Sequence, residues 1–194
     1  MLIYRFTIFT SLIYGLCFSQ ILVCSPSLAN ETTGIVWSSL QTKHTIIYFQ
    51  SLEHLEQFNR SIRYGPGPHG ILSFFSHHGN EELHKEVSTK IDAMYERVQE
   101  ILDMKKSLSR VKINLYGNSN QLHQAYSDLY GAECRIRAWY EYKNNTVYIN
   151  VNDLHEGILA HELAHSIIDN YLIVHPPRAT AEILARYVDL HLEE

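Results

Sequence analysis

Cysteine is scarce in this sequence, with three residues among 194. Cys17 and Cys24 both lie within the first 29 positions. The remaining Cys134 has no partner for an internal disulfide, and no cysteine pair is left for a structural metal site. We therefore interpret Cys134 as a small packed residue. Basic residues are also few and dispersed, which argues against a nucleic-acid partner. Repeats and low-complexity segments are absent, so one ordinary globular unit is expected.

The long apolar run is confined to residues 6–23, at the N-terminus. Arg5 precedes it, and Ser27-Leu28-Ala29 supplies the small residues that a signal peptidase reads. We expect residues 1–29 to be a signal peptide and the protein to be exported, periplasmic or secreted, without membrane association after cleavage. An uncleaved membrane anchor is the alternative, because the run is nearly long enough to span a bilayer. Residues 30–194 suffice for a single domain with its own core.

Periodic patterns predict an α+β fold for this domain. Alternating apolar residues or strong strand formers predict strands over 42–50, 111–116, 136–142 and 146–151, the last two joined by a polar turn. Helical spacing predicts helices over 52–62, 81–104, 119–130, 153–171 and 178–191. Asp153 is the expected N-cap of the fourth helix, with Glu156 completing a capping box.

The fourth predicted helix carries the most informative motif, His161-Glu162-Leu163-Ala164-His165. Side chains four positions apart share a helix face, so the two imidazoles can bind one Zn²⁺. Glu162 then projects beside the metal and can take a proton from water that the metal activates. Because the chain has 12 histidines, a shuffled sequence would contain this motif about once in twenty chains. The alternative is a pair of core histidines bonded to carbonyl groups.

A catalytic zinc needs a third protein ligand and leaves its fourth position for water. His175-Pro176-Pro177 ends the motif helix, and Pro177 suits the start of the next one. A helical hairpin would bring Glu182 back against His161 and His165. We therefore expect one zinc ion per chain, held by these three side chains.

From position 146 to position 192 the chain resembles the gluzincin metallopeptidases, whose zinc is held by HExxH and a glutamate on a following helix. The resemblance is carried by His161, Glu162, His165 and the stretch Ala181-Glu182-Ile183-Leu184-Ala185. It is closest in scale to the minimal single-domain members, sometimes called minigluzincins. It implies a zincin-like fold, in which a small mixed or antiparallel sheet packs on the motif helix and a C-terminal ligand helix. It also implies hydrolysis of peptide bonds, with Glu162 as general base and acid.

The sequence departs from the gluzincin pattern in two places. Many gluzincins carry an acidic residue four positions after the glutamate ligand, where it orients a zinc histidine; Arg186 stands there in this chain. Asp169 and Asp189 are the candidates for that role. Gluzincins also supply a histidine or tyrosine that stabilises the oxyanion. Tyr187 is the first candidate for that group, with His191, His175, Tyr140 and Tyr142 as alternatives.

The two strands before the motif helix are candidates for substrate binding. In zincins a strand near the metal commonly pairs with an extended substrate along its edge. Tyr140, Tyr142 and Tyr148 are the expected substrate-contacting side chains. A hairpin that only packs on the helix is the alternative.

Three functions follow from these patterns. The leading one is an exported, monomeric zinc metallopeptidase that hydrolyses a peptide or protein. The second is a catalytically weak or inactive gluzincin-like module that binds zinc and a partner. The third is a metal-free α+β interaction domain with two core histidines.

Overall fold

A computed structural model describes residues 36–64 and 79–192, which belong to one compact unit spanning Ile35–Glu194. The predicted signal peptide, residues 1–29, lies outside these ranges. Within them, no helix is both long enough and apolar enough to cross a membrane. Cys134 is free and half-buried.

The α+β prediction is confirmed. The strands are β1 (Ser38–Gln41), β2 (Thr45–Phe49), β3 (Val111–Tyr116), β4 (Ala138–Glu141) and β5 (Thr146–Asn150). The helices are α1 (Leu52–Ser61), α2 (Asn80–Ile101), α3 (Ser119–Tyr130), α4 (Glu156–Tyr171) and α5 (Arg178–His191), and a short 3₁₀ turn, η2 (Val151–Asp153), precedes α4. Each predicted element in the described ranges is present, within a few residues at its ends.

The five strands form one mixed sheet in the order β1-β2-β3-β5-β4. Strands β2, β3 and β5 run parallel, whereas β1 and β4 pair antiparallel at the two edges. β1 was not predicted, because its four residues are mostly exposed and carry little periodic signal. From the edge strand β4 the chain passes through β5 and the short turn η2 into α4.

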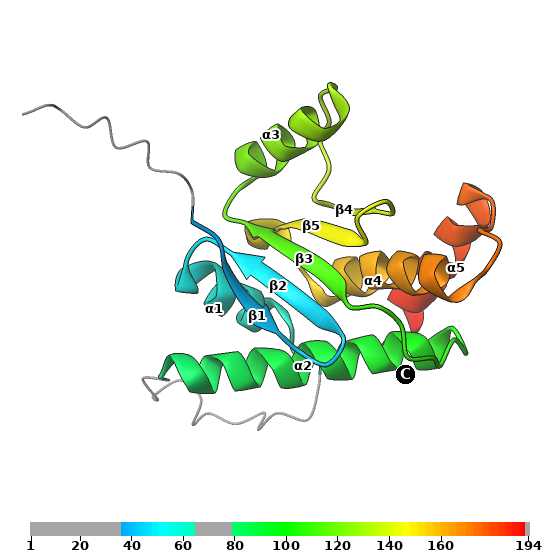
Figure 1. Ribbon diagram of the computed structural model, residues 1–194, viewed down its shortest axis with the longest axis horizontal. Helices are drawn as coiled ribbons and strands as arrows, with labels where there is room; N and C mark the ends of the chain where they lie inside the picture. The colour runs from blue at the N-terminus through cyan, green and yellow to red at the C-terminus, as the bar shows by residue number, and fades with distance from the viewer. Residues whose placement is uncertain (1–35, 65–78, 193–194) are drawn as a thin grey trace, which may run out of the picture. The chain divides into compact units, whose positions relative to one another are not determined.

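The two faces of the sheet bury different side chains, as the strand period of two requires. Ile47, Ile113 and Val147 lie on the face that packs against α1, α2, α4 and α5 in the main core. On the other face, Trp139 and Tyr148 pack with Leu122 of α3 in a smaller aromatic cluster. Figure 1 shows α3 on the opposite side of the sheet from the long helix α2.

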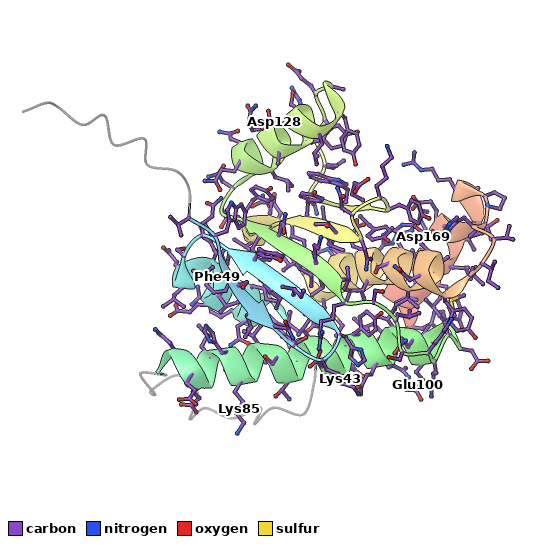
Figure 2. All side chains as sticks on the ribbon, in the orientation of Figure 1. Lys43, Phe49, Lys85, Glu100, Asp128 and Asp169 are labelled. Carbon is purple, nitrogen blue, oxygen red and sulfur yellow. The ribbon has the colours of Figure 1, made fainter. Side chains whose placement is uncertain are left out.

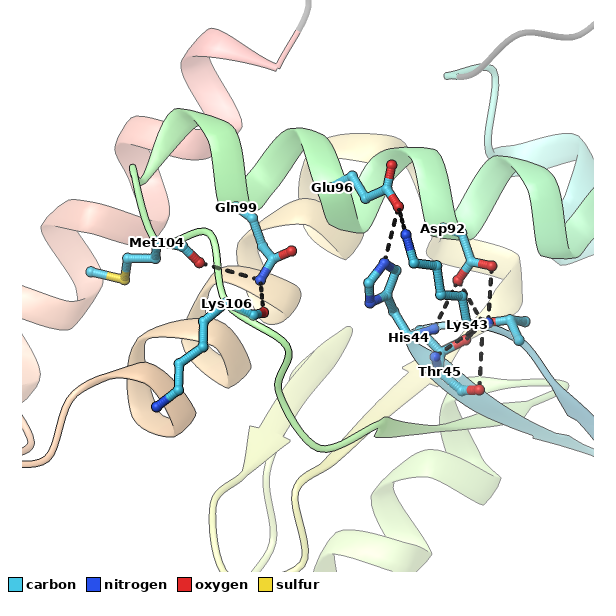
Figure 3. Close-up of polar contacts among 9 residues, drawn as sticks. Lys43, His44, Thr45, Asp92, Glu96, Gln99, Met104 and Lys106 are labelled. Carbon is cyan, nitrogen blue, oxygen red and sulfur yellow. Dashed lines mark hydrogen bonds and ion pairs between the residues drawn. The ribbon is translucent and has the colours of Figure 1, made fainter.

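Asp92 of α2 anchors the turn between β1 and β2. Its carboxylate accepts hydrogen bonds from the backbone N–H groups of Lys43 and His44 and from the Thr42 hydroxyl, at 2.7–3.0 Å (Figure 3). Farther along α2, the Gln99 amide donates to two carbonyl groups of the loop that leads to β3. These bonds satisfy turn and loop groups that have no partner in the sheet.

The start of α4 differs from the prediction. The N-cap is His155, whose Nδ1 accepts from the backbone N–H of Ile158 at 3.3 Å. Asp153 instead accepts from the Asn150 side chain within the 3₁₀ turn. Glu156 makes no capping box, because its carboxylate accepts from the backbone N–H groups of Arg63 and Tyr64. Tertiary partners thus replace the local capping that the sequence suggests.

Candidate metal centre

Two neighbouring stripes of α4 carry the polar side chains of the site. Residues 161, 165 and 169 form one stripe, and residues 162, 166 and 170 form the next, each at a spacing of four. The remaining face buries Leu159, Leu163 and Ile167 in the main core. Because the apolar face fixes the rotation of α4 about its axis, it also fixes where both polar stripes point.

α5 brings the third side chain to the histidines. The helix packs its Ala181 and Ala185 toward α4, which itself presents Ala160 and Ala164, all of them buried. Small side chains on both surfaces let the two helices approach closely. Glu182, the next residue after Ala181, lies against both imidazoles.

The distances among His161, His165 and Glu182 fit one tetrahedral ion. The two Nε2 atoms are 3.2 Å apart, and the Glu182 Oε2 lies 3.4 Å from the first and 3.7 Å from the second. Ligand atoms on a tetrahedral zinc with bonds of about 2.0–2.1 Å are separated by about 3.3 Å. Within residues 36–64 and 79–192, this is the one group of three or more His, Cys, Asp or Glu that is arranged to hold a metal.

Burial favours the form of His165 that ligates a metal. Desolvation and the neighbouring His161 lower the pKa of His165, although Glu182 and Asp169 oppose that shift. Metal binding requires a neutral imidazole. His165 is therefore in its neutral, metal-binding form at neutral pH even before a metal is bound.

Glu162 lies between the metal cluster and the edge strand. Its carboxyl group is largely buried, and the backbone N–H of Tyr140 lies close enough to favour the charged form. Desolvation, and secondly the nearby Glu182, raise the pKa of Glu162 to about 8. A carboxyl group with a raised pKa beside a metal cluster is a candidate for proton transfer.

The raised pKa of Glu162 predicts a pH-dependent stability of the metal-free protein. The folded chain retains this proton up to about pH 8, whereas an unfolded glutamate releases it near pH 4.3. The free energy of unfolding should therefore fall as the pH rises through that interval. With EDTA present, we expect Glu162→Gln to be more stable than the wild type at pH 8.5 by more than about 1 kcal/mol, and similar to it at pH 4.5. Urea unfolding at both pH values measures this, and an equal pH dependence of the two proteins would contradict it.

The pairing of β4 leaves part of its backbone free. The Asn150 N–H donates to the carbonyl of Arg137 at 3.1 Å, so this is a hydrogen-bonded pair. Such pairs alternate with non-bonded ones in an antiparallel ladder. The backbone groups of Ala138 and Tyr140 therefore point away from β5, and no strand of the described chain pairs with that edge. The open edge thus faces Glu162.

The two predicted orienting acids contact other groups. Asp169 is one turn beyond His165, near the end of α4 that leads to α5 (Figure 2), and its carboxylate lies 3.4 Å from His175 Nδ1. Asp189 lies against Gly157, one turn before His161. Among the described residues neither carboxylate forms a hydrogen bond with a metal-cluster histidine, so their orienting role stays a prediction.

The predicted oxyanion donor Tyr187 points away from the cluster. It lies about 140° around the helix axis from Glu182, is half exposed, and stacks on His191 at 4.0 Å. The spacing of five residues places it on the outer side of α5, and its role as oxyanion donor stays a prediction.

The three tyrosines predicted to contact substrate occupy different places. Tyr148 is buried and stacks on Trp139 at 4.3 Å, on the α3 side of the sheet, so its contact with substrate stays a prediction. Tyr140 faces α4, and its hydroxyl donates to Asn145 at 3.2 Å. Tyr142 is 55 % exposed and meets the ring of His175 edge-on at 4.7 Å. Only Tyr142 presents its side chain to solvent beside the free edge.

Sequence reasoning missed a polar cluster beside Glu162. Ser166 and Asn170 both donate to the Oδ1 of Asn145, in the turn between β4 and β5. The sequence signal for this cluster is that Ser166 and Asn170 follow Glu162 by four and eight positions, on the same face of the helix. Their common partner could not be seen, because it lies more than twenty residues earlier in the chain.

Comparisons with known proteins give no further identification: no protein-family model matches the chain, and neither a curated protein nor a solved structure matches it.

Proposed function

We propose that this protein is a small exported zinc metallopeptidase of the gluzincin type. The observation that carries the proposal is the convergence of His161, His165 and Glu182 at the separations of a tetrahedral ion. The Glu162 carboxyl lies beside them, largely buried near the edge strand. This combination of three ligands and an adjacent proton acceptor is what metal-assisted hydrolysis requires.

Glu162 is the general base and acid of the proposed reaction. Zinc, when held by the three side chains, supplies Lewis acidity that polarises a carbonyl and lowers the pKa of water. A nearby cation also favours the carboxylate form of Glu162 over the protonated form of the metal-free site. Glu162 then accepts the proton of the attacking water and delivers it to the leaving amine nitrogen.

The proposed substrate is an extended stretch of peptide or protein. The free N–H and C=O groups of Ala138 and Tyr140 support this assignment, because they can form a ladder with a peptide main chain. Main-chain pairing holds the peptide without selecting its side chains.

A cleavage assay with fluorescein-labelled casein tests the proposal. We expect the zinc-loaded protein to cleave casein, EDTA to abolish cleavage, and added zinc to restore it. The protein treated with EDTA and then reloaded serves as its own control for irreversible unfolding. Cleavage that is unaffected by EDTA would refute the metal mechanism.

A second function, a zinc-binding module that interacts with a partner without hydrolysis, has one observation in its favour. Tyr187, the expected oxyanion donor, is half exposed and stacks on His191 on the outer side of α5, and such donors supply a large part of catalysis. One bound zinc per chain, no casein cleavage, and no effect of Glu162→Gln beyond stability would favour the module.

A further inference from the structure

Asn145 joins three elements around the proposed active site. Its backbone N–H donates to Tyr142 in the turn after β4, and its carbonyl accepts from Lys112 of β3. Its side-chain N–H donates to the carbonyl of Arg110, just before β3, at 3.1 Å. Its Oδ1 accepts from Ser166 Oγ of α4 at 2.8 Å. One residue thus connects the edge strand, the sheet centre and the metal-binding helix.

Three donors converge on the single Oδ1 atom of Asn145. Besides Ser166, the Asn170 amide donates from 3.1 Å and the Tyr140 hydroxyl from 3.2 Å. The three donors share the two lone pairs of this carbonyl oxygen, so it has no acceptor capacity left. The Tyr140 hydroxyl is partly buried, so the loss of its hydrogen bond to Asn145 would lower the free energy of unfolding. The network therefore resists any shift of Tyr140 relative to α4.

The backbone of Asn145 fits it for this position. Its φ is 48°, in the left-handed region that asparagine and glycine tolerate best. This conformation turns the chain from β4 into β5 and directs the side chain toward α4. Asparagine supplies both the turn geometry and the acceptor oxygen, whereas glycine would supply only the turn geometry.

The network continues the stripe that begins with Glu162. Residues 162, 166 and 170 share one face of α4. Glu162 lies beside the Tyr140 N–H, while Ser166 and Asn170 donate hydrogen bonds to Asn145. β4 pairs with one strand only, β5. The contacts from α4 therefore restrain the position of β4 on the side that no strand covers. They hold the strand edge and the Glu162 carboxylate at a constant separation.

We propose that Asn145, through Tyr140, Ser166 and Asn170, is a positioning residue that sets the separation between the β4 edge and Glu162. The inference rests on the proposed peptidase function, in which a peptide lies along that edge beside Glu162. Displacement of the edge by a fraction of a bond length misaligns the scissile carbonyl and the base, which lowers kcat more than it weakens binding. Asn145 does not touch the metal ligands in this role.

The decisive variant is Asn145→Gly, which keeps the left-handed turn accessible and deletes the side chain. We expect kcat for casein cleavage to fall at least about tenfold, with KM within about threefold and one zinc still bound. Tyr140→Phe, which removes one donor only, should act in the same direction more weakly. Asn144→Ala is the matched control, because that side chain is exposed in the same turn.

Amide hydrogen exchange followed by NMR tests the inference without reference to hydrolysis. In the metal-free protein, the N–H groups of Trp139 and Glu141, which pair β4 with β5, should exchange at least about tenfold faster in Asn145→Gly than in the wild type, while the amides that join β5 to β3 stay protected. If the wild type cleaves nothing, the proposed function fails and this measurement still decides the positioning role. Unchanged exchange rates for Trp139 and Glu141, or equal acceleration throughout the sheet, would overturn it. An unchanged kcat in a cleaving enzyme would do the same.

Discussion

Replacing Glu162 with glutamine is expected to lower kcat by about 10³-fold while one zinc per chain stays bound. Glutamine keeps the shape of the side chain and an acceptor for the Tyr140 N–H, but it cannot accept the proton of the attacking water. None of the three proposed ligands is altered, so metal affinity should change little. KM should also change little, because the lost interaction belongs to the transition state.

The measurement is steady-state cleavage of labelled casein together with zinc content by atomic absorption. Glu53→Gln, an exposed glutamate in the first turn of α1, is the matched control and should behave as the wild type. Normal hydrolysis by Glu162→Gln would refute the assignment of the base. Loss of zinc together with loss of activity would show that the variant had damaged the site rather than the proton transfer.

Glu182→Ala is expected to weaken zinc binding at least about 100-fold, because it leaves two protein ligands where a catalytic zinc needs three. The same change deletes the carboxylate that lies 3.4 Å from His161 Nε2 and 3.7 Å from His165 Nε2. Casein cleavage should disappear with the metal. Competition with a chromogenic zinc chelator measures the affinity directly.

Arg178→Ala is the control for Glu182→Ala on the same helix. Its guanidinium is 94 % exposed and lies 3.8 Å from the Glu182 carboxylate, so its removal should leave zinc affinity unchanged or slightly higher. Equal zinc binding by the wild type and Glu182→Ala would assign the third ligand to another residue. If the wild type binds no zinc after refolding with the metal present, the third function, a metal-free α+β interaction domain, would be favoured.

Local patterns in the sequence determined the elements and the motif helix. The bounds predicted for β3, α3 and α5 agree with the structure, because each is delimited by residues that favour or end it. The i, i+4 spacing was sufficient to place His161 and His165 on one face. Pro176 and Pro177 were sufficient to predict a helical hairpin, and with it the approach of Glu182.

Strand register was beyond the reach of the sequence. In the sheet Tyr140 is opposite Val147, so Tyr148 belongs to the other face. A shift of one residue would have exchanged the two faces, and nothing in the turn sequence specified which register forms. This is why Tyr148 was assigned to the substrate side although it lies in the α3 cluster.

The sequence by itself therefore determined most of the secondary structure from local patterns. It also determined the two-histidine face and the choice of Glu182, because both depend on spacing along one or two helices. Only the tertiary structure decided which backbone groups of β4 stay free, where Tyr187 and Asp169 point, and that Asn145 binds α4. Those features depend on the packing of elements that are distant in the chain. Their geometry is set by the shared core and the sheet register, which no local pattern encodes.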